Sequence, residues 1–337
     1  MVTVSEEKKG RSLLLLFAGV REMGISVFIV FLIAAVSLRS PYFLTVDNLV
    51  YILIDIAILT IVAIGETLVI LTRSIDLSVA STLALSGMIV GMTISKHQGI
   101  PPAVAVLMGL AIGAVLGSVN GLLVAKGRIP PIIATLGTLS IYRGLVFAIS
   151  GGAWVDAHEM PRPFVYLSKN TTLGIPNLVL FAIIVAIIFY YFLNHTRTGR
   201  EIYAVGSNPS AARVVGIRVD RILFLVYLLS GTLAGMAGVL WISRYASAQS
   251  DTASGFELQA IAATVVGGVN IFGGSGTLPG VVLGSLLMGI IVNALNLIRI
   301  SPFWKLAVQG FIILLAVVSD ALLSRRLQQA GASEGAS

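Results

Sequence analysis

Long apolar stretches, broken by short polar connections, dominate the pattern of the chain. An α-helix needs about 20 apolar residues to cross a bilayer, and runs such as NLVLFAIIVAIIFYYFLN (177–194) approach that length. The pattern predicts about ten membrane-spanning helices, the eighth of them short. Their approximate ranges are 22–38, 48–71, 77–95, 102–125, 131–150, 176–194, 221–243, 257–271, 277–298 and 303–323.

Composition supports an all-α fold, a polytopic transmembrane helical bundle. Charged residues make up 11% of the chain and hydrophobic residues 57%, whereas a soluble domain carries about 25% charged residues. Charge this sparse cannot cover a water-exposed surface, so most of the outside must face lipid. The chain has no cysteine, and His97, His158 and His195 show no metal-ligand spacing. The sequence therefore predicts no disulfide, metal site or cofactor.

The distribution of positive charge predicts the topology. With the N-terminus in the cytoplasm, 14 of the 22 Lys and Arg residues fall on the cytoplasmic side, as the positive-inside rule requires. An even number of spans then leaves the C-terminus cytoplasmic too. We expect a cytoplasmic segment 1–21, a single transmembrane domain 22–323 with a cytoplasmic loop 195–220, and a cytoplasmic tail 324–337. This topology accounts for the net charge of +7 without nucleic acid.

Two stretches in different halves of the chain share a pattern. Each is a polar, helix-breaking turn followed by a helix rich in small residues: LTRSIDLSVASTLALSGMIVG (71–91) and GGVNIFGGSGTLPGVVLGSLLMG (267–289). Such corresponding interruptions indicate a weak internal repeat around a central pathway.

Glycines recur at helical spacing in several predicted spans. Gly109, Gly113, Gly117 and Gly121 form one stripe, and a similar stripe begins at Gly231 in the seventh span. Small residues let membrane helices approach closely. We therefore interpret these glycines as packing surfaces and not as a phosphate-binding loop.

Two carboxylates fall inside the second predicted span. Asp55 and Glu66 are eleven residues apart, which places them on one helix face, separated by about 16 Å along the axis. A carboxylate at mid-bilayer is costly, so this face should point into the bundle or a wet pathway. The alternative is that Asp55 is hydrated near the outer interface and Glu66 bonds to a neighbouring helix.

Asp76 and Arg143 complete the candidate translocation pathway with Asp55 and Glu66. The side chain of Asp76 is predicted to accept a hydrogen bond from the N–H of Ser78 or the following residue, capping the third span. Arg143 lies inside the fifth predicted span and must snorkel, line a cavity or pair, with Glu66 or Asp55 as candidate partners.

A short capped helix is predicted inside the cytoplasmic loop, in AVGSNPSAARVVGIRVD (204–220). Asn208 is a strong N-cap, Pro209 suits the first helical position, and Gly216 fits the C′ position. A helix this short is marginal alone in water. It must dock either on its own protein or on another polypeptide, and the small, basic face of the helix suits a partner's groove. That face consists of Ala211, Ala212 and Arg213.

Several motifs, in order over about 45–322, resemble the membrane permease of ribose-type ABC importers, a family similar to the branched-chain amino-acid permeases. They are GREIYAVGSNPSAARVVGI, LTRSIDLSVAS, IPPIIATLGTLSIYRGL, SGTLAGMAGVL and ATVVGGVNIFGGSGTLPG. GGAWVDAHEM, GFELQAIAA and ISPFWK look closest to the rhamnose and autoinducer-2 branches. The chain departs from the family pattern at Glu66, often Gln, and at Arg73 and Ser74, often Gly-Gly.

The resemblance implies a transport subunit of a bacterial inner membrane, without catalysis of its own. A periplasmic binding protein would deliver a sugar, and two identical or related permease subunits would form the pathway. Two cytoplasmic ATPase subunits would bind a coupling helix at 208–216, and Gly206 is assigned to the same coupling element. The rival hypothesis is a proton-coupled secondary transporter that uses Asp55 or Glu66. A membrane-embedded enzyme is disfavoured because no nucleophile–base pair or metal cluster is evident.

Overall fold

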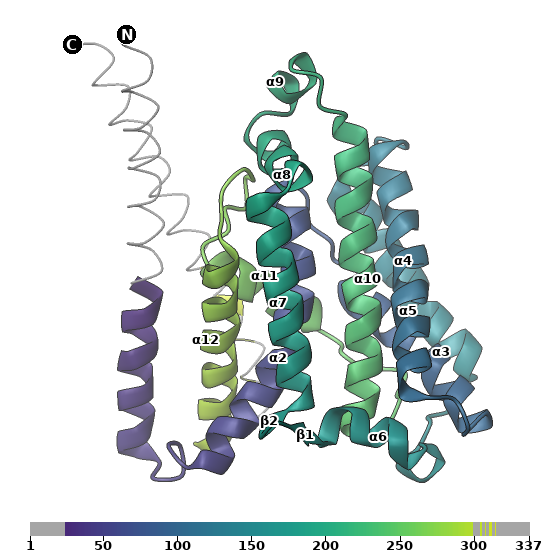
Figure 1. The fold of residues 1–337 in the computed structure, drawn as a ribbon, viewed down its shortest axis with the longest axis vertical. Coiled ribbons are helices and arrows are strands. Elements are labelled where there is room, and N and C mark those ends of the chain that lie inside the picture. Colours follow the sequence, from purple (N-terminus) through teal and green to yellow (C-terminus); the bar gives the residue numbers. More distant parts are fainter. Residues whose placement is uncertain (1–23, 299–303, 305–306, 308–309, 312–313, 315–337) are drawn as a thin grey trace.

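The computed structural model of the chain describes residues 24–298 together with residues 304, 307, 310, 311 and 314. This part of the chain forms a bundle of roughly parallel and antiparallel helices (Figure 1). Seven of its helices are long and apolar enough to span a membrane. They are α2 (Val46–Leu71), α3 (Val79–Lys96), α4 (Pro102–Ala125), α5 (Pro131–Ser150), α7 (Asn177–His195), α10 (Val219–Tyr245) and α12 (Leu278–Leu297).

Most of the shorter elements lie at the two ends of the bundle or beside it (Figure 1). Helices α8 and α9 project at one end, whereas α6 and a two-stranded antiparallel hairpin cover the other (Figure 1). The hairpin pairs Thr171 with Pro176 and Thr172 with Ile175. The shorter elements are the helix Gly24–Arg39, η1 (Ala157–Glu159), α6 (Arg162–Lys169), β1 (Thr171–Thr172), β2 (Ile175–Pro176), α8 (Arg197–Ser207), α9 (Pro209–Val214) and α11 (Phe256–Val266).

The predicted spans agree with the helices except near the C-terminus. Two predicted ranges, 102–125 and 131–150, coincide with α4 and α5. The predicted span 257–271 is too long, because α11 has only 11 residues and rises about 16 Å, half of a hydrocarbon core of about 30 Å. The backbone leaves the helix at Gly267 and turns at Gly268, where φ is +97°.

Some predictions fall on residues that the structure does not describe. The predicted segments 1–21 and 324–337 lie outside the described residues, as does most of the tenth predicted span. The count of about ten spans and the cytoplasmic location of both termini therefore stay predictions. The weak internal repeat also stays a prediction, although an irregular turn does precede both α3 and α12.

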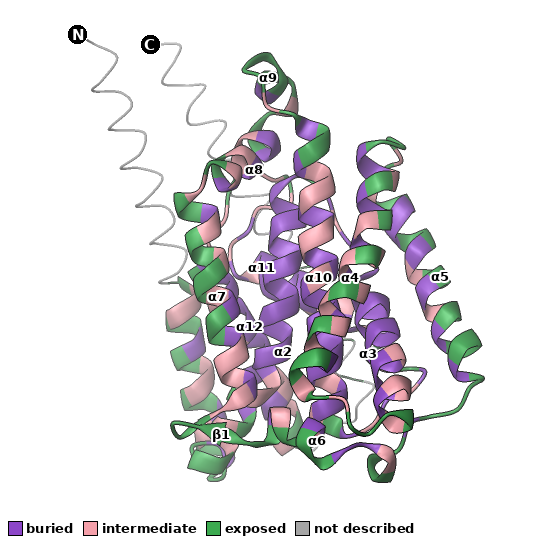
Figure 2. Ribbon diagram, turned by 45° about the vertical axis from the view of Figure 1, so that its right-hand side comes forward, coloured by how far each residue is buried: buried purple, intermediate pink, exposed green. Residues whose placement is uncertain are grey.

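Helix α2 forms the centre of the bundle. Every residue from Ile56 to Leu71 is buried, and the helix contacts α7, α10, α11 and α12. Figure 2 shows this helix enclosed, whereas α5 and α7 expose much of their outer faces. An apolar helix with no polar face belongs in the interior of such a bundle, and the apolar outer faces of α5 and α7 suit lipid.

The predicted glycine stripe on α4 is confirmed as a packing surface, and its partner is the stripe on α10. A Cβ atom at Gly113 would collide with the carbonyl oxygen of Gly231 and lie 2.8 Å from the Cα of Gly235. Gly109 and Gly117 meet the same helix in the same way. Backbone lies directly against backbone along this interface, an approach that only small residues permit.

This contact predicts that Gly113→Leu prevents correct packing of α4 on α10. Overpacking a close interface typically costs about 1–3 kcal/mol, and here the obstacle is rigid backbone. We expect a much smaller monodisperse fraction in size-exclusion chromatography after detergent extraction and a lower unfolding temperature. Gly144→Leu is the matched control, because a Cβ atom at Gly144 on α5 would meet nothing within 4 Å. Equal losses in both variants would contradict the interpretation.

Candidate functional site

The N-cap predicted for the short helix in 204–220 is confirmed in α9. The side chain of Asn208 accepts hydrogen bonds from the N–H groups of Ser210 and Ala211, both at 3.0 Å. Pro209 occupies the first helical position, where its missing N–H is not needed.

The predicted C-terminal glycine is confirmed as well. Gly216 adopts a φ of +86° and donates its N–H to the carbonyl of Arg213 at 3.0 Å, while Ile217 donates to the carbonyl of Ala212 at 2.9 Å. These two bonds form a Schellman motif. Helix α9 is thus six residues long and is closed at both ends by its own sequence.

The face of α9 that is open to solvent differs from the predicted one. Ala212 is predicted on a partner-binding face, but it is only 3% exposed and packs in the protein's own core. Ala211 and Arg213 are exposed as predicted. On the solvent-exposed side of α9, the largest apolar side chains are those of Val214 and of the C-cap residue Val215. They are 87% and 75% exposed. No sequence motif identifies either residue.

Gly206, predicted to belong to the coupling helix, lies in α8 instead and faces the membrane domain. A Cβ atom there would collide with the carbonyl oxygen of Leu71 at the end of α2 and lie 2.6 Å from the backbone nitrogen of Gly274. Gly274 in turn donates its N–H to the carbonyl of Leu71 at 3.0 Å. Gly206 therefore allows α8 to dock on α2 and on the connection between α11 and α12.

Two further side chains fasten α8 in this position. Arg73 follows α2 with a φ of +63° and donates to the carbonyls of Gly206 and Ser207. Tyr203 donates its hydroxyl to the carbonyl of Gly276 at 2.9 Å, and burial raises the pKa of Tyr203 to about 12, so this donor stays protonated. The family often has glycine where this chain has Arg73, and this difference is the sequence feature that corresponds to the contact between Arg73 and α8.

Glu66 and Asp76 come together in a buried cluster near the same end of α2. An oxygen of Glu66 accepts the N–H of Asp76 at 3.0 Å. Asp76 in turn accepts the N–H of Ser78 at 2.9 Å, the bond predicted from the sequence, and its hydroxyl at 2.6 Å. Asn120 of α4 donates to the hydroxyl of Ser78 at 2.7 Å. Both carboxyl groups are essentially inaccessible, and neither forms an ion pair in the described part of the chain.

Asp55 and Arg143, near the opposite end of the bundle, do not pair with each other. Asp55 forms an ion pair with Arg244 at the end of α10. The guanidinium of Arg244 also donates to the carbonyl of Ile54 at 3.2 Å and lies 5.0 Å from the ring centre of Tyr245. From the distribution of positive charge, Arg244 is predicted to lie in a connection on the outer side. The candidate partners of Arg143 that the sequence predicts are Asp55 and Glu66. The structure shows neither of those pairs.

Arg143 instead holds the connection between α10 and α11. Its guanidinium donates to the carbonyls of Ser250 and Thr252, at 3.2 and 2.8 Å. The same connection forms a two-way backbone bridge between Ala248 and Val155, with both bonds at 3.0 Å.

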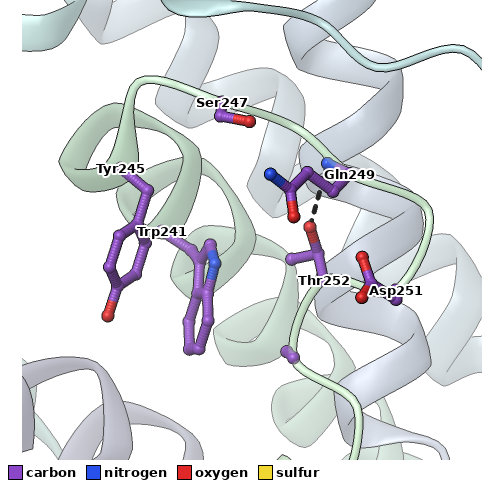
Figure 3. A pocket seen from close by; sticks show the side chains of 7 residues that line it. Trp241, Tyr245, Ser247, Gln249, Asp251 and Thr252 are labelled. Carbon is purple, nitrogen blue, oxygen red and sulfur yellow. Dashed lines mark hydrogen bonds between the residues drawn. The ribbon is translucent and has the colours of Figure 1, made fainter.

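A cavity of about 360 Å³ opens beside this connection (Figure 3). A second cavity of about 190 Å³ adjoins it and is lined by Asp55 and Arg244. The two share Trp241 and Tyr245. The side chains around the first cavity are mainly aromatic or polar: Trp241, Tyr245, Ser247, Gln249, Asp251 and Thr252.

The four predicted pathway residues thus divide into two groups. Asp55 lines the second cavity and Arg143 supports the connection that forms the first, whereas Glu66 and Asp76 are buried at the other end of α2. Within the described residues, no group of three or more His, Asp or Glu side chains lies close enough to hold a metal ion.

Comparisons with known proteins agree with this architecture. The ribose import permease protein of Escherichia coli (strain K12) is 42% identical over 291 residues, covering 86% of this chain and 90% of its own. The autoinducer 2 import system permease protein of Enterobacter sp. (strain 638) is 38% identical, with coverage of 91% and 88%. The D-allose transport system permease protein of Escherichia coli (strain K12) is 38% identical, with coverage of 88% and 91%.

The family described as "Branched-chain amino acid transport system / permease component" matches residues 48–317. No solved structure matches the chain. With its apolar helices, this match indicates a multi-pass protein of the bacterial inner membrane. The chain therefore belongs to this permease family and is a transmembrane subunit of an ATP-binding cassette importer.

Proposed function

We propose that this subunit imports a sugar or a sugar-like solute. The names of its relatives support this class, because they specify ribose, allose and autoinducer 2. The motifs that resemble the rhamnose and autoinducer-2 branches are compatible with the same class, and the identity of the solute is left to experiment. A periplasmic binding protein delivers the solute, and a separate cytoplasmic ATPase supplies the energy.

Two copies of this chain, or this chain and a related one, form the pathway in the proposed assembly. Both termini lie in the cytoplasm, as the positive-inside rule favours. Helices α8 and α9 then face the ATPase, and α6 with the β1–β2 hairpin faces the periplasm. Alternating access follows when ATP binding and hydrolysis favour different conformations of the assembly in turn.

Helix α9 is the observation that carries this proposal. It projects from one end of the bundle (Figure 1) and presents Val214 and Val215 to solvent. Both caps fix its conformation, so its free surface is preorganised for a partner. We assign the ATPase contact to the exposed side of α9, where Ala211, Arg213 and these valines lie, with Asn208, Pro209 and Gly216 setting its shape.

The proton-coupled alternative has less support in the geometry. Asp55 is engaged by a guanidinium, and Glu66 accepts a backbone N–H inside a buried cluster. Both arrangements stabilise connections between helices. We therefore assign Glu66 and Asp76 to the structure of the α2–α3 connection, and Asp55 to the wall of the pathway.

Reconstitution tests the proposed function directly. We expect proteoliposomes that contain this chain, its ATPase and its binding protein to accumulate radiolabelled D-ribose or D-allose only with hydrolysable ATP. A protonophore should leave the initial rate unchanged. Uptake by this chain alone, driven by a proton gradient, would overturn the proposal.

A second prediction concerns the exposed valines of α9. Val214→Asp and Val215→Asp should weaken association with the ATPase about tenfold or more, because a charge replaces an apolar contact at an interface. Co-purification and titration of the detergent-solubilised subunits would measure this loss, while the unfolding temperature should stay unchanged. Leu173→Asp is the matched control, because this apolar side chain is 95% exposed in the β1–β2 hairpin at the opposite end of the bundle, and it should leave ATPase binding unchanged. Normal ATPase binding by both valine variants would refute the assignment.

A third prediction separates a structural Glu66 from a proton carrier. Glu66→Gln should preserve ATP-driven uptake, because the amide oxygen can still accept the N–H of Asp76. Glu66→Leu leaves that buried N–H without a partner, which costs about 1–3 kcal/mol, and should lower the unfolding temperature. If Gln abolished uptake while the protein stayed folded, Glu66 would have a role in transport that the cluster does not explain.

A further inference from the structure

The cavity at the end of α10 has one aromatic side and one polar side. Figure 3 shows the rings of Trp241 and Tyr245 together, with Gln249, Thr252 and Asp251 across the space from them. Trp241 is held in place by an edge contact with Phe256, with ring centres 5.2 Å apart. A volume of about 360 Å³ is within the range of small-molecule sites.

These two sides are complementary to a monosaccharide. A sugar ring has an apolar C–H face, which packs on flat aromatic rings. Its hydroxyl groups donate to carboxylates and exchange hydrogen bonds with amides and hydroxyls. We infer that the cavity lined by Trp241, Tyr245, Gln249, Asp251 and Thr252 is a binding site within the permease for a monosaccharide released from the binding protein.

The connection that supplies the polar side is held in a defined shape. Ala246 and Ala253 adopt φ values of +49° and +56°, a left-handed conformation that is uncommon for residues other than glycine. The guanidinium of Arg143 fixes the carbonyl of Thr252, and the bridge to Val155 fixes Ala248. Unfavourable backbone conformations held by their surroundings are concentrated at functional sites, and preorganisation of this kind favours ligand binding.

The adjoining cavity offers a way deeper into the bundle. Asp55, Arg244 and Gln259 bring polar groups to its wall, between α2, α10, α11 and α12. A hydroxylated solute leaving the first cavity would keep hydrogen-bonding partners there.

A branched-chain amino acid fits the first cavity less well. Its ammonium and carboxylate groups need two opposite charges, and among the described residues that line this cavity Asp251 is the single charged side chain. The nearby guanidinium of Arg244 is already paired with Asp55. The lining therefore favours a neutral, hydroxylated ligand.

The inference rests on the proposed import of a sugar, and intrinsic fluorescence tests it separately from transport. The chain has three tryptophans, and Trp154 and Trp304 are 56% and 64% exposed. The full-length variant Trp154→Phe/Trp304→Phe leaves Trp241 as the single reporter. We expect D-ribose or D-allose to change its emission saturably in lipid nanodiscs, whereas L-leucine has no effect.

Two substitutions on the polar side sharpen the test. Asp251→Asn and Gln249→Ala should each raise the apparent Kd for the sugar about tenfold, the effect of losing a hydrogen bond to a charged or well-placed partner. Asp220→Asn, at the other end of α10, is the control and should leave the Kd unchanged.

The possible failures are distinguishable. If the assembled transporter imports D-ribose or D-allose but neither sugar changes Trp241 emission, the cavity assignment is wrong and the proposed function stands. A response to L-leucine in place of the sugars would overturn the assignment of ligand class. If sugar binds with wild-type affinity to both polar-side variants, the binding site lies elsewhere. Absence of any ATP-driven sugar uptake would instead reject the proposed function.

Discussion

Backbone groups in the connections between helices must find their hydrogen-bond partners outside the helical ladders, and the organisation of this permease depends on that constraint. The connection between α2 and α3 is anchored by the carboxylate of Glu66. The connection between α10 and α11 is anchored by the guanidinium of Arg143. The connection between α11 and α12 donates an N–H to the carbonyl of Leu71. Each irregular segment is thus fixed by a group from another element, so the shape of the bundle and of its cavities is set by a few polar contacts.

These anchors change what a charged residue in a transmembrane segment indicates. The cost of placing Glu66 or Arg143 in a bilayer points equally to a transport pathway and to an internal anchor. The structure shows anchors in both cases, because each side chain is engaged by backbone groups of a connection. Asp55 differs, since its ion pair with Arg244 forms part of a cavity wall. Burial and partner type, and not the charge alone, therefore distinguish the two roles.

The features that the sequence predicted correctly depend on local chemistry. The caps of α9 could be predicted because Asn208 and Gly216 act on backbone groups within three or four residues. The glycine stripe of α4 could be predicted because helical periodicity places its members on one face. The burial of Ala212 could not be predicted in this way, because it depends on contacts between segments distant in sequence. The start of α8 at Thr196 and the end of α11 at Gly267 do have local signals, but the apolar pattern alone does not reveal them. The pairing of Asp55 with Arg244 joins residues separated by 189 positions, and no spacing rule reaches across that distance.

A chain of direct contacts connects α9 with the cavities through α2. Helix α8, adjoining α9, lies with Gly206 against the last carbonyl of α2, and Arg73 fastens it there. Helix α2 then runs without interruption to Asp55, about 24 Å away along the axis, where the ion pair with Arg244 joins it to the cavity wall. A displacement of α8 that preserves its contacts must carry the C-terminal end of α2 with it. Because α2 is continuous and is buried from Ile56 to Leu71, we expect such a movement to change the wall of the adjoining cavity.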